Sequence, residues 1–66
     1  MQLKINGQLQ ELPEGINVPE LLKELGLAPA TVLVERNQIA LLRSEWDETK
    51  LQNGDTIEIL KVAAGG

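Results

Sequence analysis

The chain has no cysteine, no histidine, no phenylalanine and no tyrosine among its 66 residues, and Trp46 is its only aromatic residue. Without cysteine it has neither a disulfide nor a thiolate to act as nucleophile or metal ligand. Without histidine it also lacks the commonest general base and metal ligand. A hydroxyl such as that of Ser44 is a weak nucleophile when no base is positioned beside it. These absences argue against an independent enzyme and predict no catalytic residue and no metal site.

Long apolar segments are absent as well. Residues 1–6 contain no apolar stretch like that of a secretory signal. No run approaches the roughly 20 apolar residues that a membrane-spanning helix needs. The sequence therefore predicts a cytoplasmic protein that does not associate with membranes.

Positive charge is scarce: six Lys and Arg residues stand against ten Asp and Glu residues, for a net charge of −4. This balance disfavours nucleic acid as a partner, because such binding depends on Lys and Arg neutralising phosphates. It favours a partner with a basic docking face. Acidity that only keeps a small domain in solution explains the same composition, and both interpretations remain open at this point.

Aliphatic residues are plentiful and follow the patterns of short strands and one helix. Leu3 and Ile5 alternate with polar residues, which is typical of a half-buried strand. Asn6-Gly7 then predicts a tight hairpin turn, with a return strand over residues 8–12. Asn17 and Glu20 have the spacing of a capping box, which predicts a helix over residues 18–25 that ends at Gly26.

The second half of the chain predicts more strands. Residues 32–36 are apolar and β-branched, Asn37-Gln38 turns the chain, and residues 39–42 form a short return strand. Residues 44–48 are expected to form a capped single turn, and a turn at 53–55 precedes a last strand over 56–62. This order predicts an α+β fold: a mixed four- to five-stranded sheet, with one helix packed across one face and the last strand beside the first.

The last strand has one apolar and one mixed face. Ile57 and Ile59 share the first, while Thr56 and Glu58 mark the second as facing solvent. Leu60 and Val62 also belong to this second face. If the strands over 32–36 and 56–62 are neighbours, Leu33 joins them in a small exposed apolar patch. Exposed apolar patches often mark partner docking, although scattered surface aliphatics are ordinary.

The chain ends in four small residues, Ala63, Ala64, Gly65 and Gly66. They span at most roughly 14 Å when extended. No branched side chain widens them, and a glycine lets another molecule approach its backbone closely. We expect a domain over residues 1–62 and a flexible tail over 63–66 that presents the α-carboxylate of Gly66. A frayed terminus without function is the alternative.

The chain resembles the ThiS family of sulfur carriers over nearly its whole length. The terminal Gly65-Gly66 carries part of the likeness. Four other stretches carry the rest: Ile5-Asn6-Gly7, Val34-Glu35-Arg36-Asn37, Arg43-Ser44-Glu45-Trp46 and Gly54-Asp55-Thr56-Ile57-Glu58-Ile59. The resemblance implies the ubiquitin-like β-grasp fold, which agrees with the predicted order of elements.

The resemblance also implies a function in thiamin (thiazole) biosynthesis. A ThiF-like enzyme would use ATP to adenylate the Gly66 carboxylate. A persulfide donor, such as a cysteine desulfurase, would then supply the sulfur that replaces AMP and leaves a thiocarboxylate. A ThiG-like thiazole synthase would receive this sulfur. The chain would be a carrier on which enzymes act, and it would bind no cofactor itself.

Three other functions fit the same pattern of residues. A MoaD-like carrier for molybdopterin synthesis shares the fold, the tail and the chemistry but serves another acceptor. A ubiquitin-like modifier would join Gly66 to a lysine through an isopeptide bond. A β-grasp interaction module with an inert tail would need no chemistry at Gly66.

Overall fold

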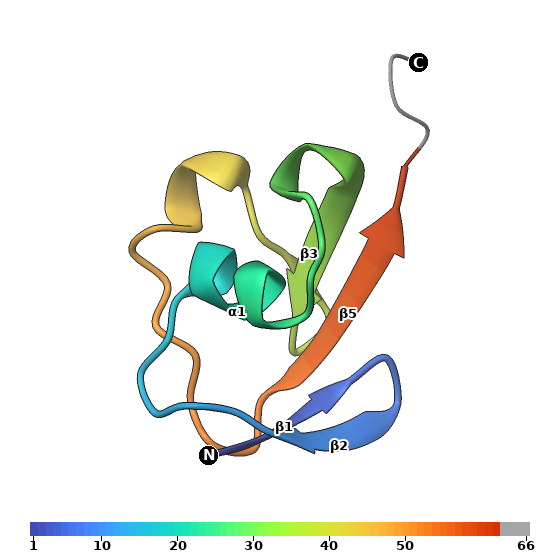
Figure 1. Cartoon of the computed structure of the whole chain (residues 1–66). Helices are drawn as coiled ribbons and strands as arrows, with labels where there is room; N and C mark the ends of the chain where they lie inside the picture. The colour runs from blue at the N-terminus through green and yellow to red at the C-terminus, as the bar shows by residue number, and fades with distance from the viewer. Residues whose placement is uncertain (63–66) are drawn as a thin grey trace.

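The computed structural model describes residues 1–62, and residues 63–66 lie outside the described part. Five strands form one mixed sheet in the order β2-β1-β5-β3-β4 (Figure 1). The strands are β1 (Gln2–Ile5), β2 (Gln8–Glu11), β3 (Val32–Arg36), β4 (Ile39–Ala40) and β5 (Thr56–Lys61). The first and last strands pair in parallel, and every other pair is antiparallel. The expected mixed sheet of four to five strands, with the last strand beside the first, is confirmed, and it has five strands.

The first hairpin turns at Asn6 and Gly7, which have φ angles of 49° and 86°. A two-residue turn of this kind needs positive φ at both positions, and Asn and Gly adopt it most readily. Asn6 also ties the hairpin to β5. Its Oδ1 accepts the N–H of Ile59 at 2.8 Å and its Nδ2 donates to the Ile59 carbonyl at 3.3 Å.

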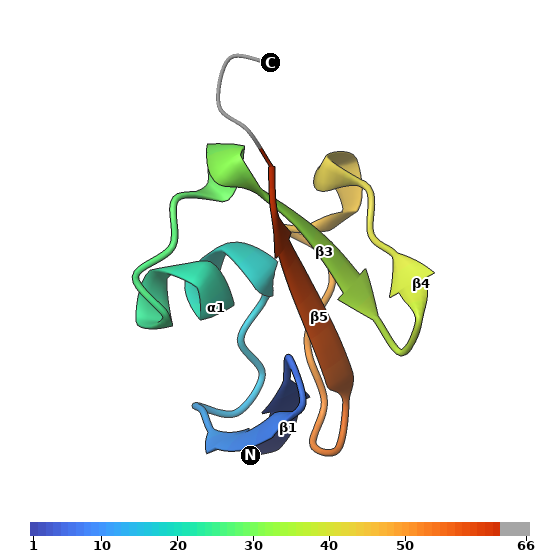
Figure 2. The same ribbon diagram turned by 90° about the vertical axis from the view of Figure 1, so that its right-hand side faces the viewer.

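Helix α1 (Val18–Glu24) lies across one face of the sheet, beside β3 and β5 in both views (Figures 1 and 2). The predicted capping box is present. The Asn17 side chain accepts the N–H of Glu20, the Glu20 carboxylate accepts that of Asn17, and both distances are 2.9 Å. Leu25 is the C-cap, and the chain leaves the helix through Gly26 at a φ of 71°.

The core lies between α1 and the sheet face that α1 covers. Trp46, 4% exposed, closes one side of this core from the loop before β5. The remaining buried apolar residues are Leu3, Ile5, Ile16, Val18, Leu21, Leu22, Val32, Val34, Leu51, Ile57 and Ile59. No helix within residues 1–62 is long and apolar enough to cross a membrane.

Two short 3-10 turns differ from the expectation. Strand β4 ends at Ala40 instead of reaching residue 42, and the following turn, η2 (Arg43–Glu45), begins one residue before Ser44. The cause is local: the Glu45 carboxylate accepts the N–H of Leu42 at 2.8 Å and so starts the turn there. The other turn, η1 (Pro29–Thr31), has no counterpart in the prediction.

Candidate functional site

The predicted apolar group lies on the open face of the sheet, where β5 runs beside β3. Leu33 and Leu60 are directly opposite one another in the register of these strands. Leu33, Leu60 and Val62 are 50%, 49% and 38% exposed. Val62 is two residues after Leu60 and therefore on the same side of the strand. We call these three residues the docking patch after the role expected for them from the sequence; the structure shows that their side chains are exposed, and the docking role stays a prediction.

The sequence prediction missed Leu42, an apolar neighbour of the patch that is 65% exposed. Glu35 pairs with Ala40, and the Leu41 N–H still donates to the Val34 carbonyl at 2.9 Å. Continuing that register by one residue puts Leu42 next to Leu33. Because the Asn37-Gln38 turn sets this register, the sequence already held the signal that would have found Leu42.

An acidic pair borders the docking patch. Glu35 and Glu58 are directly opposite one another on β3 and β5, one row along from Leu33 and Leu60. Both carboxylates are on the face that α1 does not cover. The open face therefore combines an apolar row with concentrated negative charge.

The two 3-10 turns lie at the same end of the domain as the end of β5 (Figures 1 and 2). Val62 N–H donates to the Thr31 carbonyl at 2.8 Å, which holds the end of the strand against η1. Arg43 joins η2 to η1 by donating to the Pro29 carbonyl at 2.8 Å, and it joins η2 to β3 by donating to the Val32 carbonyl at 2.9 Å. Its guanidinium also stacks 4.7 Å from the centre of the Trp46 ring. Val62, the last described residue, is thus hydrogen-bonded to η1.

At the start of β5 a buried carboxylate organises the turn between β3 and β4. Asp55 accepts hydrogen bonds from Arg36 Nε at 2.8 Å, Asn37 Nδ2 at 3.1 Å and the Gln52 N–H at 2.8 Å. Burial raises the pKa of Asp55, but these hydrogen bonds and the charge of Arg36 outweigh burial, so its pKa lies below the ordinary value. No buried side-chain nitrogen or oxygen within the described residues lacks a hydrogen-bond partner, which indicates a structural role for this cluster.

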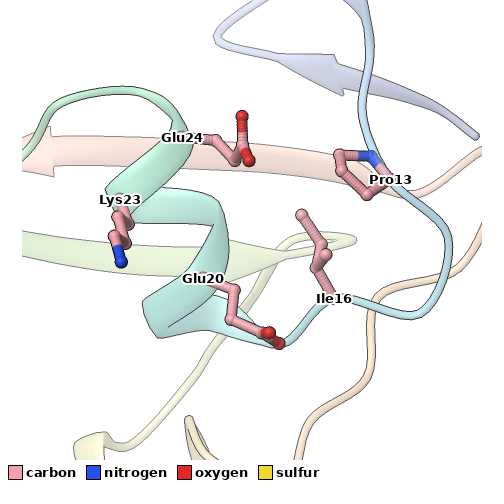
Figure 3. Close-up of a pocket in the computed structure, with 5 residues that line it drawn as sticks. All are labelled: Pro13, Ile16, Glu20, Lys23 and Glu24. Carbon is pink, nitrogen blue, oxygen red and sulfur yellow. The ribbon is translucent and has the colours of Figure 1, made fainter.

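A hollow of roughly 530 Å³ opens beside α1, and Ile16 points into it between the helix and the loop that carries Pro13 (Figure 3). Its charged lining consists of Glu20, Lys23 and Glu24, and Glu20 already caps the helix. Within residues 1–62 no three metal-ligating side chains gather at one place.

The expected sulfur-carrying residue, Gly66, lies outside the described residues. So do the residues expected to keep access to it open: Ala63, Ala64 and Gly65. The structure therefore describes the point from which the tail begins and the surface around it. The chemistry of the carboxylate remains a prediction from the sequence.

A five-stranded mixed sheet crossed by one helix, with the last strand parallel to the first, defines a ubiquitin-like β-grasp domain. The crystal structure of the thiamine biosynthesis protein ThiS from Geobacter metallireducens has the same fold. It superimposes with a TM-score of 0.85 at 39% identity, and the match covers all of both chains.

The sequence also matches the ThiS family over residues 3–66. It is 35% identical to the sulfur carrier protein ThiS of Escherichia coli strain K12 across the full length of both chains. The chain belongs to the ThiS family. It is also 35% identical, along its whole length, to part of a thiazole synthase from Magnetococcus marinus, but it spans only 20% of that protein. A second thiazole synthase, from Paramagnetospirillum magneticum, has the same coverage.

Proposed function

We propose that this chain is the sulfur carrier of thiamin (thiazole) biosynthesis and that it holds sulfur as a thiocarboxylate on Gly66. Membership of the ThiS family and the Gly65-Gly66 ending support this function. The observation that carries it is the full-length similarity to a protein named as a sulfur carrier.

The proposed chemistry starts at an ionised carboxylate, which is a poor electrophile at neutral pH because its pKa is about 3.3–3.7. A ThiF-like enzyme activates it: one carboxylate oxygen attacks the α-phosphate of ATP, pyrophosphate leaves, and an acyl-adenylate forms on Gly66. The terminal sulfur of a persulfide donor, such as a cysteine desulfurase, then attacks the acyl carbon and AMP leaves. A second thiol breaks the resulting sulfur–sulfur bond and forms a disulfide with the donor, which leaves the thiocarboxylate on this chain.

This chemistry assigns the catalytic groups to the partners. The chain has no His and no Cys, so acid–base steps, nucleotide binding and persulfide formation belong to the enzymes that act on it. Its own contribution is the Gly66 acyl carbon on a narrow run of small residues, with Gly65, Ala64 and Ala63 leaving the approach open. It acts as a carrier and not as an enzyme.

The proposed acceptor is a thiazole synthase. Two proteins named thiazole synthase contain a stretch similar to this whole chain. In those proteins the carrier-like stretch and the rest of the thiazole synthase belong to one polypeptide. This arrangement supports a partnership between a carrier such as this chain and a thiazole synthase. The docking patch of Leu33, Leu60 and Val62 adjoins the base of the tail, and we propose that the partner enzymes dock there.

The test is a reconstitution with a ThiF-like enzyme, ATP and a persulfide donor, followed by intact-mass measurement. Deleting Gly66 should abolish sulfur incorporation, because Ala64-Gly65 then ends one residue short of the activating site. Ala63→Gly, the matched control, keeps the terminal carboxylate and should load like the unchanged chain. Equal loading of the truncated chain would refute the assignment to Gly66, and lysine conjugates in place of a thiocarboxylate would indicate a modifier.

A further inference from the structure

The open face of the sheet carries its negative charge directly beside its apolar surface. Glu35 and Glu58 are opposite one another, and the next outward-facing pair along the strands is Leu33 with Leu60. Alternate residues of a strand face the same side. The acidic pair and the docking patch therefore form one continuous surface.

The acidic pair is unfavourable in the isolated domain. The Cβ atoms of directly opposite residues are about 4.5–5.5 Å apart, and side chains of like charge at such positions destabilise a sheet. Among the described residues neither carboxylate has an ion pair: the pairs found join the Met1 amino group to Glu11 and Glu14, and Arg36 to Asp55. Lys4 is on the same face but beside Thr56, and it forms no ion pair with Glu58. Two partly exposed carboxylates thus face one another without a cation.

We propose that this surface receives a partner in which an arginine lies beside an apolar projection, so that the guanidinium inserts between Glu35 and Glu58 while the projection covers the docking patch. A guanidinium presents five N–H donors in a planar fork and can donate to two carboxylates at once. Its charge offsets the repulsion between them, which the free carrier bears. The net charge of −4 attracts the same basic surface from a distance.

Other occupants fit this surface less well. A second copy of the chain, docked face to face through the patch, would bring two acidic pairs together. A metal ion would find only two carboxylates, and no group of three ligating side chains exists within residues 1–62. Charge complementarity therefore favours a basic protein surface. The identity of that partner as the adenylating enzyme rests on the proposed function.

The test compares Glu35→Gln, Glu58→Gln and the double variant with Glu24→Gln, which removes the same charge from α1 on the opposite side of the sheet. Loading by the ThiF-like enzyme is measured as KM and kcat, and the melting temperature is recorded for each chain. We expect the double variant to raise KM at least about tenfold with kcat unchanged, because ground-state docking is lost. The same variants should melt about 1–4 °C higher, because the repulsion is removed. Glu24→Gln should leave KM unchanged.

In the double variant we expect binding to weaken while stability rises. A purely structural role for the two glutamates would not weaken binding and raise stability together. If the unchanged chain loads and the double variant loads with the same KM, the inference is overturned and the proposed function stands. If the unchanged chain does not load, the proposed function fails, and titration calorimetry against the adenylating enzyme and the thiazole synthase decides the inference. Weaker binding by the double variant then supports it, whereas equal binding or none overturns it. A dimer in sedimentation that the Gln variants strengthen would identify a second copy as occupant and overturn it as well.

Discussion

Within residues 1–62, three residues other than glycine have positive φ, and each sits in a hairpin turn: Asn6 at 49°, Asn37 at 51° and Gln38 at 71°. Asparagine tolerates this conformation better than most residues. Asn6 and Asn37 also use their side chains to hold β5, through Ile59 and Thr56. Gln38 has no described side-chain hydrogen bond that compensates for its strained backbone.

Gln38→Gly should therefore stabilise the domain. Glycine adopts positive φ without the steric cost that a side chain incurs, so we expect the free energy of unfolding to rise by about 0.5–1 kcal/mol. Urea denaturation measures this change. Gln2→Gly, in the extended backbone of β1, is the control and should lower stability. A loss of stability in Gln38→Gly would contradict the account.

The Asp55 cluster predicts a specific response to acid. Because the folded pKa of Asp55 lies below its unfolded value, its contribution to stability is present above about pH 4 and is lost as pH falls through the folded pKa. Asp55→Asn should cost about 1–3 kcal/mol at neutral pH, because Arg36 loses its charged partner. It should also flatten the dependence of unfolding free energy on pH below about pH 4, because the folded pKa of Asp55 lies below its ordinary value. Denaturation series at several pH values measure this, with the exposed Asp47→Asn as control; an unchanged acid dependence would count against the cluster.

At the scale of elements, β5 joins the core to the proposed site. Ile57 and Ile59 face α1 and are buried, whereas Leu60 and Val62 are exposed at the end from which the tail begins. The alternation of a single strand therefore separates residues that stabilise the fold from residues available to a partner. Substitutions on the outer face should affect binding more than stability.

Leu60→Glu tests this separation. Leu60 is 49% exposed, so the change should cost at most about 1 kcal/mol of stability. It should weaken docking of the partner enzymes strongly, because it places a charge within the apolar patch. Leu9→Glu is the matched control: Leu9 is 68% exposed on the outer face of β2, opposite Lys4 and away from the patch. Equal binding by the two variants, or a large drop in the melting temperature of Leu60→Glu, would contradict the assignment.

Local signals in the sequence predicted most elements because their causes are local. Asn6-Gly7 determines the first turn, and Asn17 with Glu20 determines the start of α1. The end of β4 was not predictable in the same way. It depends on a hydrogen bond from Leu42 to the Glu45 side chain, which competes with continued pairing to β3, and strand periodicity does not reveal that competition.

At the scale of the molecule, the order of elements was sufficient to predict a mixed α+β sheet with one helix, because a final strand beside the first leaves one face for α1 and one face open. The docking patch followed from the same reasoning. The opposition of Glu35 and Glu58 did not, because it depends on how β3 and β5 pair along their length. The β-grasp fold itself was implied by the resemblance to the ThiS family. The role of Gly66 still rests on the sequence and on membership of the ThiS family.

The central claim is that the terminal carboxylate of Gly66 carries sulfur, and intact-mass measurement of the protein isolated from its native host tests it most directly. The account predicts a fraction of molecules whose mass is increased by the exchange of one oxygen for one sulfur, with fragmentation assigning the change to Gly66. Only unmodified protein from cells that are actively making thiamin, or sulfur attached to any other residue, would contradict it.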